Sequence, residues 1–424
     1  MSTALFTDRY ELTMLQAALR SGKANRQCVF EVFARQLPAG RRYGVVAGTG
    51  RVLEAIENFK FSEDELGFLS NQSIVDQQTL DWLAGYKFEG NITGYQEGEL
   101  YFGHSPVLTV EASFAQAVIL ETVILSIMNY DSAVASAAAR MKSAAGDRRL
   151  IEMGSRRANE NAAVAAARAA AIVGFDATSN LEAGRRFGIT TAGTSAHAFT
   201  LLHDSEQEAF EAQLASMGNQ TTLLVDTFDV ANAVDLAVKL TEGKIKAVRL
   251  DSGDLSQSAI EVRRQLDALG AKDTEITVTS DLDEYTIAAL AVAPINTYGV
   301  GTSLVTGSGH PTAGFVYKLV SHSDGEAWTD VAKRAAKKSN RGGKKFASRQ
   351  LEDGKAKVEL ISDRLPEGRP LQIPLVTDGS IRSELTGYKG VEIAAEHHKL
   401  AISELSGSAL RLSKGDQAIP VEFI

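Results

Sequence analysis

An arginine and an aspartate stand two residues apart in the segment Arg249-Leu-Asp251-Ser-Gly253-Asp254. In a strand, residues at this spacing lie on the same face. The guanidinium could bind a carboxylate or a phosphate, and the acid could hold ribose hydroxyls or a magnesium-bound group. The alternative is a surface ion pair followed by a turn at Ser252-Gly253, and this segment alone is compatible with both.

Two further clusters combine small, polar and titratable residues. In Tyr298-Gly-Val-Gly301-Thr302-Ser303 the glycines would free backbone N–H groups to bind a phosphate, although a tight turn is the alternative. In Gly193-Thr194-Ser195-Ala196-His197 a histidine follows a predicted strand, where a neutral imidazole could be a nucleophile or base. A solvated or simply hydrogen-bonded histidine is the other interpretation. We expect the pair His397-His398, in the C-terminal tail, to lie on the surface.

The elements that must position these clusters form a regular pattern after residue 150. Short apolar runs alternate with helical stretches, as in repeated βα units. The predicted strands are Leu150–Ser155, Phe175–Asn180, Ile189–Thr194, Thr222–Asp226, Ala247–Asp251, Ile276–Asp281 and Tyr298–Thr302. The predicted helices between them are Arg157–Ala170, Val230–Leu240, Gln257–Leu269 and Glu284–Ala293. Seven units favour a β/α barrel, possibly incomplete, and the pattern leaves a doubly wound sheet open.

The active site of a β/α barrel lies at the C-terminal ends of its strands. The predicted strand ends carry polar side chains, three of them acidic: Arg156, Ser179, Thr194, Asp226, Asp251, Asp281 and Thr302. Helix N-capping is the alternative for any one of them, since Ser, Thr and Asp are good caps. Their convergence on one end of the barrel favours a binding site.

The segments outside the barrel pattern are more varied. Tyr10–Ser21 has helical spacing, Cys28–Phe33 alternates like a strand with one solvent-facing side, and Ala115–Tyr130 and Ser132–Ala145 are predicted as two long helices. The tail has strand-like pieces that we expect to pack with the N-terminal region. The predicted domains are an N-terminal α/β sandwich (1–112), a β/α barrel with the active site (113–325) and a C-terminal segment (326–424).

Composition excludes several classes of function. The chain has 424 residues and a net charge of -9, so bulk attraction to nucleic acid or an anionic membrane is not expected. A single cysteine, Cys28, excludes disulfides and cysteine-rich metal sites. The start lacks a secretory signal and no uncharged apolar stretch reaches 18 residues, so we expect a soluble, cytoplasmic protein. Motifs of P-loop enzymes and of common hydrolases are absent.

The clusters, in this order, resemble nicotinate phosphoribosyltransferase. The segments that carry the resemblance are Thr7–Met14, Phe30–Phe33, Glu152–Arg157, Gly193–His197, Arg249–Asp254, Thr279–Asp281, Tyr298–Thr306 and Tyr317–Leu319. The resemblance implies a type II phosphoribosyltransferase fold, an irregular β/α barrel plus an α/β sandwich domain. It implies a homodimer with a shared active site that makes nicotinate mononucleotide and diphosphate from nicotinate and 5-phosphoribosyl 1-diphosphate in NAD salvage. ATP hydrolysis would drive the reaction.

The same resemblance implies roles for individual residues. Tyr10 of the partner subunit would stack on the pyridine ring, and His197 would be phosphorylated by ATP. Arg249, Arg156 and Thr194 would bind nicotinate, and Gly301 and Thr302 would hold the 5-phosphate. Asp251 and Asp281 would face the ribose and a Mg²⁺ ion, which the diphosphate carries without a fixed protein site. The basic stretch Gly342–Arg349 resembles a family segment; a phosphate contact is one hypothesis for it and a solvated loop is the alternative.

Other functions remain to be weighed against this one. The nicotinamide-using relative differs by an amide in place of a carboxylate, and the segment from Gly193 to Phe199 favours the acid. Quinolinate phosphoribosyltransferase shares the fold but is shorter and lacks the phosphorylated histidine. A phosphate-binding aldolase or isomerase would place a Schiff-base lysine at a strand end, and none of the seven ends has one. A non-catalytic binding protein would have no need of the set His197, Arg249 and Asp251.

Overall fold

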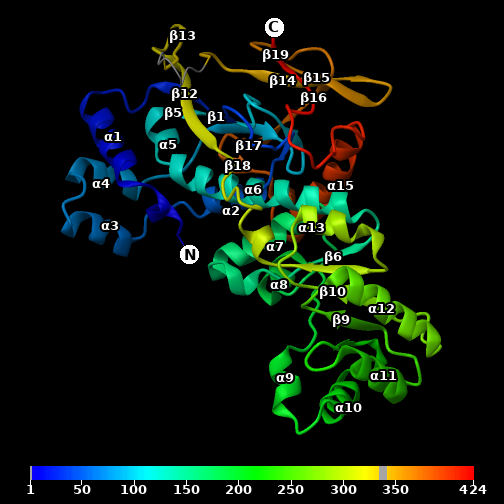
Figure 1. Cartoon of the computed structure of the whole chain (residues 1–424). Coiled ribbons are helices and arrows are strands. Elements are labelled where there is room, and N and C mark those ends of the chain that lie inside the picture. Colours follow the sequence, from blue (N-terminus) through cyan, green and yellow to red (C-terminus); the bar gives the residue numbers. More distant parts are fainter. Residues whose placement is uncertain (1, 334–340) are drawn as a thin grey trace. The chain divides into compact units, whose positions relative to one another are not determined.

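The computed structural model describes residues 2–333 and 341–424, which form two compact units (Figure 1). The sheet unit contains Met1–Ser136 and His310–Ile424, and the barrel unit contains Ala137–Gly309. These divisions differ from the predicted boundaries after residues 112 and 325. Residues 315–323 form strand β12, which pairs with the N-terminal strand β1 (Gln27–Ala34), so this stretch belongs to the sheet unit.

The barrel unit is built on six parallel strands. They are β6 (Arg149–Glu152), β7 (Ala177–Thr178), β8 (Thr222–Leu224), β9 (Ala247–Leu250), β10 (Glu275–Val278) and β11 (Thr297–Val300). Their order in the sheet is β7-β6-β11-β10-β9-β8, so the last strand pairs with the first and the sheet is open only between β7 and β8. This curled half-barrel confirms the predicted barrel, and its cyclic strand order excludes a doubly wound sheet.

One of the seven predicted strands, Ile189–Thr194, is wrong. Only Thr191 forms a bridge, to Thr178 at the end of β7, and most of the neighbouring residues are exposed or half-buried. The segment runs along the open edge of the sheet, so it has no second strand to pair with. Its β-branched residues are typical of a strand, but the segment lacks the series of hydrogen bonds to a neighbouring strand that would make it one.

The four predicted helices of the barrel unit are present as α7 (Glu160–Ile172), α11 (Val230–Thr241), α12 (Leu255–Ala268) and α13 (Glu284–Ala289). Four helices that were not predicted accompany them, namely α8 (Leu181–Phe187), α9 (His197–Leu202), α10 (Glu206–Met217) and α14 (Thr302–Val305). Figure 1 shows α11 and α12 alongside β9 and β10. Side chains cap α7, α8, α10, α11, α12 and α13, namely Asn159, Asn180, Ser205, Asp229, Asp254 and Asp283. None of the seven strand-end residues is among these caps, so the capping interpretation of them is wrong.

The sheet unit contains a seven-stranded sheet in the order β13-β12-β1-β5-β3-β17-β18. Besides β1, its strands are β3 (Asn91–Tyr95), β5 (Leu108–Ser113), β12 (Phe315–Ser323), β13 (Trp328–Asp330), β17 (Gln372–Thr377) and β18 (Ser380–Ile381). The predicted solvent-facing side of β1 is wrong: seven of its eight residues are buried, because the strand is central in the sheet and the segment that contains Lys345 covers that side at Glu31. Glu31, on that side, pairs with Lys345 at 2.7 Å.

Two smaller sheets and seven α-helices complete the described part of the sheet unit. The sheets contain β14 (Phe346–Glu352), β15 (Lys355–Ser362), β16 (Arg369–Pro370) and β19 (Val421–Phe423), and β2 (Gly44–Val45) with β4 (Leu100–Tyr101). The helices are α1 (Arg9–Arg20), α2 (Thr49–Glu57), α3 (Glu63–Asn71), α4 (Gln77–Ala84), α5 (Phe114–Val118), α6 (Glu121–Ala145), whose last residues belong to the barrel unit, and α15 (Gly387–Ser403). The predicted pair Ala115–Tyr130 and Ser132–Ala145 is thus one short helix and one long one.

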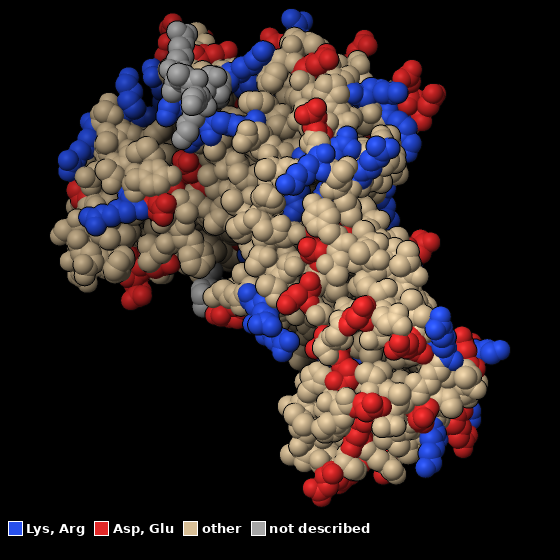
Figure 2. Space-filling model, in the orientation of Figure 1, with Lys and Arg blue, Asp and Glu red and all other residues tan. Residues whose placement is uncertain are grey.

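The stretch Phe114–Ala145 is long and apolar enough to span a membrane by length and composition. In its most apolar window 67% of the residues are buried inside the fold, which is typical of a core helix in a soluble protein. On the face shown in Figure 2, Lys and Arg side chains are interspersed with Asp and Glu.

The basic stretch Gly342–Arg349 is not a solvated loop, which corrects one of its two interpretations. Lys344 pairs with Glu111 at 2.7 Å, Lys345 pairs with Glu31, and the fully buried Arg349 pairs with Glu99 at 2.6 Å. Carboxylates of the sheet unit therefore already neutralise these cations. The basic residues that precede it, within 334–340, lie outside the described residues.

Candidate active site

A cavity of about 480 Å³ opens at the C-terminal ends of the strands in the barrel unit. It is lined by Met153, Ser155, Arg156, Arg157, Ser179, Ala192, Gly193, Thr194, Ser195, Ala196, Arg249, Asp251, Thr279, Ser280, Asp281, Gly299, Gly301 and Thr302. Seven of the nine predicted site residues are in this set. The barrel therefore brings Arg156, Thr194, Arg249, Asp251, Asp281, Gly301 and Thr302 to one volume of ligand size.

Arg249, on β9, is the best-ordered cation of the cavity. Its Nε donates to Thr279 Oγ1 at 3.0 Å, and one terminal nitrogen donates to Thr194 Oγ1 at 2.6 Å and to the Ser195 carbonyl at 3.1 Å. The other terminal nitrogen lies 3.3 Å from Asp251 Oδ1. Two of its partners are neutral hydroxyls, and the one carboxylate beside it, Asp251, is also the more distant contact, so the guanidinium is less fully neutralised than one enclosed by several acids.

Thr279 is a residue whose role the sequence did not reveal. Its buried hydroxyl accepts from Arg249 and donates to Asp251 Oδ1, so one side chain orients both charged groups. The methyl group of Thr279 occupies the space that a Cβ at residue 299 would need, at 2.5 Å. Gly299 therefore makes room for the side chain that aligns the arginine and the aspartate.

His197, the first residue of α9, faces two carboxylates. Its Nε2 lies 3.7 Å from Asp251 Oδ2 and 4.0 Å from Asp226 Oδ1, and its Nδ1 lies 3.1 Å from Thr227 Oγ1. Its side chain is 38% exposed, so a ligand can reach the ring.

Asp226 is the second residue without a predicted role of its own, although it was among the predicted strand ends. Its Oδ2 accepts from the Asp251 backbone N–H at 2.7 Å and from Ser252 Oγ at 2.9 Å. Its Oδ1 is buried without a hydrogen-bond partner among the described residues and points toward His197. The available signal was its position at the end of β8, which matches that of Asp251 after β9.

Comparisons with known proteins place the chain in a family. Residues 5–129 match the model of the nicotinate phosphoribosyltransferase N-terminal domain, and residues 148–363 match the model of the nicotinate phosphoribosyltransferase family. Nicotinate phosphoribosyltransferase pncB1 of Mycobacterium tuberculosis is 51% identical over 438 residues, which cover 99% of this chain and 95% of that protein.

The chain belongs to the nicotinate phosphoribosyltransferase family.

More distant relatives extend the similarity. The nicotinate phosphoribosyltransferase of Bacillus subtilis is 38% identical over 341 residues, covering 78% of this chain and 69% of that protein. The crystal structure of human nicotinic acid phosphoribosyltransferase superposes with a TM-score of 0.82 at 25% identity and covers 98% of both chains. The fold is thus the type II phosphoribosyltransferase fold that the sequence predicted, and the chain is an enzyme of this family.

The backbone is strained at one edge of the candidate site. Ser280, between Thr279 and Asp281, has φ +138°, which side chains other than glycine rarely adopt. This turn places Asp281 on the cavity wall. On the β11 side, a Cβ at residue 301 would come within 3.2 Å of the Met153 carbonyl, so Gly301 permits close approach of the two backbones.

The carboxylates fit a metal that is only partly held by protein. Asp251 and Asp281 offer the oxygen ligands that Mg²⁺ prefers, but no group of three or more His, Cys, Asp or Glu residues that could hold a metal ion occurs in residues 2–333 and 341–424. A magnesium ion would therefore depend on the oxygens of a phosphorylated substrate.

Tyr10 lies in the other unit, on α1. Its side chain is 46% exposed, and burial together with Glu121 and Glu11 raises its pKa to about 12, so the ring remains a neutral phenol. The next residue, Glu11, is buried and accepts from the Thr122 backbone N–H at 2.9 Å and from the Thr7 hydroxyl. Glu11 thereby fixes the start of α1, and with it Tyr10, on α6.

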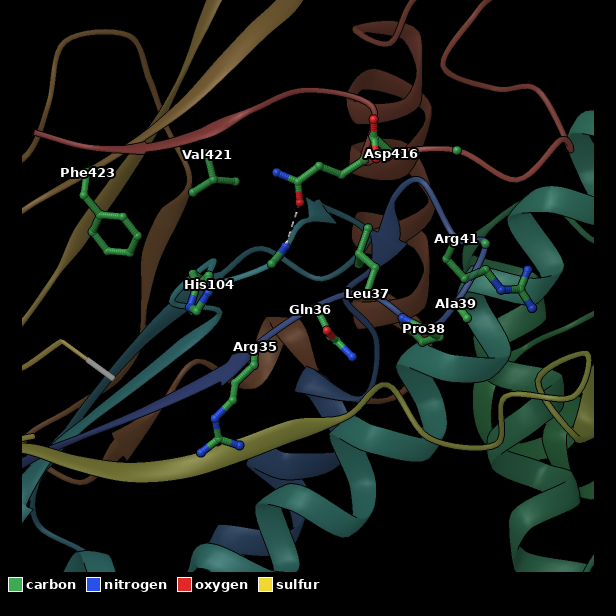
Figure 3. A pocket seen from close by; sticks show the side chains of 14 residues that line it. Arg35, Gln36, Leu37, Pro38, Ala39, Arg41, His104, Asp416, Val421 and Phe423 are labelled. Atoms are coloured by element: carbon green, nitrogen blue, oxygen red, sulfur yellow. Dashed lines mark hydrogen bonds between the residues drawn. The ribbon is translucent and has the colours of Figure 1, made fainter. Parts of the chain in front are cut away.

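A second cavity, of about 360 Å³, lies in the sheet unit between the loop from Arg35 to Arg41 and the chain near its end (Figure 3). In Figure 3 the side chains of Arg35 and Arg41 point in different directions, and His104 lies near neither Arg41 nor Asp416. None of the predicted site residues lines this cavity. It does not gather groups for the reaction in the way that the barrel cavity does.

The pair His397-His398 is not on the surface, contrary to expectation. His398 is 4% exposed and its Nδ1 lies 2.9 Å from the Gly98 carbonyl, while His397 Nε2 lies 2.9 Å from Glu99 Oε2. Helix α15 packs these rings into the sheet unit. Both histidines are therefore structural and not part of the candidate site.

Proposed function

We propose that this enzyme joins nicotinate to 5-phosphoribosyl 1-diphosphate, giving nicotinate mononucleotide and diphosphate for NAD salvage. The observation that carries the proposal is Arg249, a cation held by hydroxyls inside a cavity that also contains two aspartates. A guanidinium donates strong, charge-assisted hydrogen bonds to a carboxylate. Nicotinate has such a carboxylate and nicotinamide does not, so Arg249 favours the acid.

The reaction needs charge stabilisation more than a covalent catalyst. The pyridine nitrogen forms a bond to ribose C1 as the C1–O bond to diphosphate breaks, and the bonding electrons leave with diphosphate. Positive charge grows on the ribose ring, where Asp251 and Asp281 can orient hydroxyls and stabilise it. Arg156 forms no hydrogen bond or ion pair within the described ranges, and it is free to bind the ring or its carboxylate. Gly301 and Thr302 are proposed to hold the 5-phosphate.

The bound Mg²⁺ would neutralise the leaving diphosphate. The diphosphate itself would carry the ion, and the carboxylates of Asp251 and Asp281 are the cavity groups suited to contact it. The protein residues would then hold the two substrates in the geometry for reaction. The entropic cost of bringing two substrates together is a large part of the barrier, and binding removes it before the chemical step.

We assign ATP coupling to His197. A ring nitrogen would attack the γ-phosphorus of ATP, forming an N–P bond as the P–O bond to ADP breaks, and water would later cleave the N–P bond to release phosphate. Asp226 and Asp251 face the ring and suit the positive charge that it carries when phosphorylated. Phosphate release would then make the overall transfer favourable.

The remaining family expectations concern assembly and location. We propose a homodimer in which Tyr10 of one subunit completes the active site of the other by stacking on the pyridine ring. The exposed ring of Tyr10 and the rigid attachment of α1 through Glu11 support this role. We also propose that the enzyme is cytoplasmic, where its substrates and ATP are available.

Product formation tests these assignments directly. Purified enzyme is given nicotinate or nicotinamide, phosphoribosyl diphosphate and Mg²⁺, with and without ATP, and the mononucleotides are separated by chromatography. We expect nicotinate mononucleotide, in a larger amount with ATP. A folded protein that makes no mononucleotide from either base would refute the proposed reaction.

The His197→Ala variant separates transfer from coupling. We expect slow transfer to persist while the stimulation by ATP and the labelling of the protein by γ-³²P-ATP are lost. His203→Ala is the matched control, because His203 ends the same helix and contacts Phe199 away from the cavity. A His197→Ala enzyme that is stimulated as strongly as the parent would remove His197 from the coupling role.

A further inference from the structure

A third cavity, of about 460 Å³, lies in the sheet unit and is nearly as large as the active-site cavity. Helix α1 forms one wall, and the start of β1 with the end of β12 forms the other. The lining residues are Met14, Ala17, Ala18, Ser21, Lys23, Arg26, Cys28, Phe114, Leu319 and His322. None of them belongs to the site described above.

The inner surface of this cavity is apolar. Met14, Phe114 and Leu319 are only partly buried and pack against the main hydrophobic core of the sheet unit, and Cys28 is almost completely buried. Apolar surface that remains exposed in a concave site of this volume is typical of a small-molecule site.

The charged residues of the lining are all basic or titratable to a cation. Lys23, Arg26 and His322 line the cavity, and no aspartate or glutamate does. His322 Nδ1 is buried without a hydrogen-bond partner among the described residues. Asp324, which follows β12 in sequence, accepts from the backbone N–H groups of Ala327 and Glu326, and these bonds lower its pKa, to which the charge of Arg26 adds only a minor effect.

We propose that this cavity binds a medium-chain monocarboxylate, with the hydrocarbon chain against Met14, Phe114 and Leu319 and the carboxylate at Arg26, Lys23 and His322. An uncharged hydrocarbon would leave the cations unused, and a cationic amphiphile would be repelled by them. The site shares no residue with the transferase cavity, so its failure would not refute the proposed reaction. It does require that the proposed dimer, in which Tyr10 reaches the partner, leaves Met14 and Ala17, on the same face of α1, accessible.

Cys28 makes the proposal measurable, because it is the only cysteine in the chain. It lies in the lining, and burial raises the pKa of its thiol to about 11. The thiol is therefore mostly protonated and reacts slowly at neutral pH, and a reagent must enter the cavity to reach it. Mass spectrometry of the intact protein then counts one modification from one known site.

The experiment follows the rate of Cys28 alkylation at pH 8.5 in the full-length enzyme with increasing decanoate, octanoate or hexanoate. We expect saturable protection that strengthens about fourfold for each added methylene, so that decanoate binds about tenfold or more tightly than octanoate. Decanol, which has the same chain and no charge, should protect much less. Protection that is absent, or equal for decanol and decanoate, would overturn the proposal.

Two variants distinguish this site from nonspecific adsorption. Arg26→Gln should weaken decanoate binding about tenfold, as expected for loss of a hydrogen bond to a charged group, and should leave the decanol result unchanged. Arg20→Gln is the matched control, since Arg20 ends α1 but pairs with Asp76 and does not line the cavity. Equal effects of the two substitutions would contradict the assignment of the carboxylate to Arg26.

A direct binding measurement tests the proposal even if the Cys28 thiol does not react with the alkylating reagent. Equilibrium dialysis with radiolabelled decanoate should show binding to the parent enzyme and its loss in Ala17→Trp, which fills the cavity from the exposed side of α1. Absence of binding to the parent overturns the proposal. If alkylation instead slows as protein concentration rises without any ligand, a second copy of the chain covers the cavity, and the proposal is also wrong.

Discussion

Arg249 in the barrel unit and Arg349 in the sheet unit both lie beside carboxylates, but their surroundings differ. Arg349 is fully buried and binds two glutamates, Glu99 at 2.6 Å and Glu359 at 2.8 Å. Arg249 has one aspartate at 3.3 Å, and its closer partners are hydroxyls and a carbonyl. The first arginine is neutralised by the protein, and the second is oriented by the protein but left charged for a ligand.

The carboxylates beside these two arginines differ in the same way. Burial alone would raise the pKa of Glu99, but Arg349, His397 and Arg369 together hold it well below its usual range. The cluster closes through Glu404, which binds Arg369 at 2.7 Å. In the barrel unit, Asp251 is partly exposed in the cavity and Asp226, which bonds to the Asp251 backbone, keeps one oxygen unpaired among the described residues. In the sheet unit each carboxylate of the cluster lies against a buried cation, whereas in the barrel unit Asp226 and Asp251 keep oxygen atoms that a ligand or His197 can use.

The largest effect should come from breaking the buried cluster. Arg349→Met would leave Glu99 and Glu359 without their shared cation, and removal of one partner of a buried ion pair costs about 3–5 kcal/mol. Chemical denaturation, followed by circular dichroism, should show this loss in the free energy of unfolding. Lys344→Met, which breaks a half-exposed pair with Glu111, is the control and should cost about 1 kcal/mol or less.

In the barrel cavity, Arg249→Lys should impair binding and not folding. A lysine keeps the charge but loses the two-pronged geometry and the bond to Thr279. We expect kcat/KM for nicotinate to fall about 100-fold, since hydrogen bonds to charged groups contribute about 1.5–3 kcal/mol. Steady-state kinetics with nicotinate and nicotinamide check this. An equal loss for both bases would show that Arg249 does not recognise the carboxylate.

A smaller effect is expected from the group that orients the arginine. Thr279→Val keeps the shape but removes the hydroxyl that links Arg249 and Asp251, and we expect about a tenfold loss in kcat/KM. Thr279→Ser keeps the hydroxyl and should restore most of the activity. The KM for nicotinate should rise more than the KM for phosphoribosyl diphosphate. A valine variant with parental kinetics would make Thr279 a packing residue only.

The contrast between the two arginines also shows what a sequence can and cannot predict. The strand ends of the barrel were predictable, because alternation of apolar runs and helices fixes which residues reach one end of the sheet. Arg249, Asp251 and Asp281 lie there, as their spacing indicated. Thr279 and Asp226 were visible at the same ends, but their roles depend on which side chains meet across neighbouring strands, and this is decided by packing.

The sheet unit was harder to predict for the same reason. Arg349 and Glu99 are 250 residues apart in sequence, and nothing local to either one indicates a partner. A cluster of lysines and arginines therefore looked like a solvated loop, and His397-His398 looked like surface. The false strand Ile189–Thr194 has the opposite cause: its local pattern is correct for a strand, but the open edge of the barrel gives it only one bridge.

Glu11 is a buried carboxylate that, unlike Glu99, has no cation in contact with it among the described residues. Its hydrogen-bond partners are Thr7 and Thr122, and burial raises its pKa from 4.5 to about 7. Between these two values the folded state holds a proton that the unfolded state has lost. The stabilisation is therefore complete below about pH 4.5 and is lost as the pH rises toward 7, with a slope of at most about 1.4 kcal/mol per pH unit.

Glu11→Gln should remove this part of the pH dependence, because the amide keeps the shape and cannot ionise. Denaturation curves at several pH values between 4.5 and 8 measure the slope for the parent and the variant. Glu65→Gln is the control, since Glu65 is a helix-capping carboxylate whose pKa is lowered by bonds to Ser62, although partial burial opposes the shift. Its loss should act in the opposite direction, below pH 4.5. If Glu11→Gln leaves the slope between pH 4.5 and 7 unchanged, the two threonines stabilise the ionised carboxylate as well as Arg349 stabilises Glu99, and the distinction between paired and unpaired charges drawn here fails.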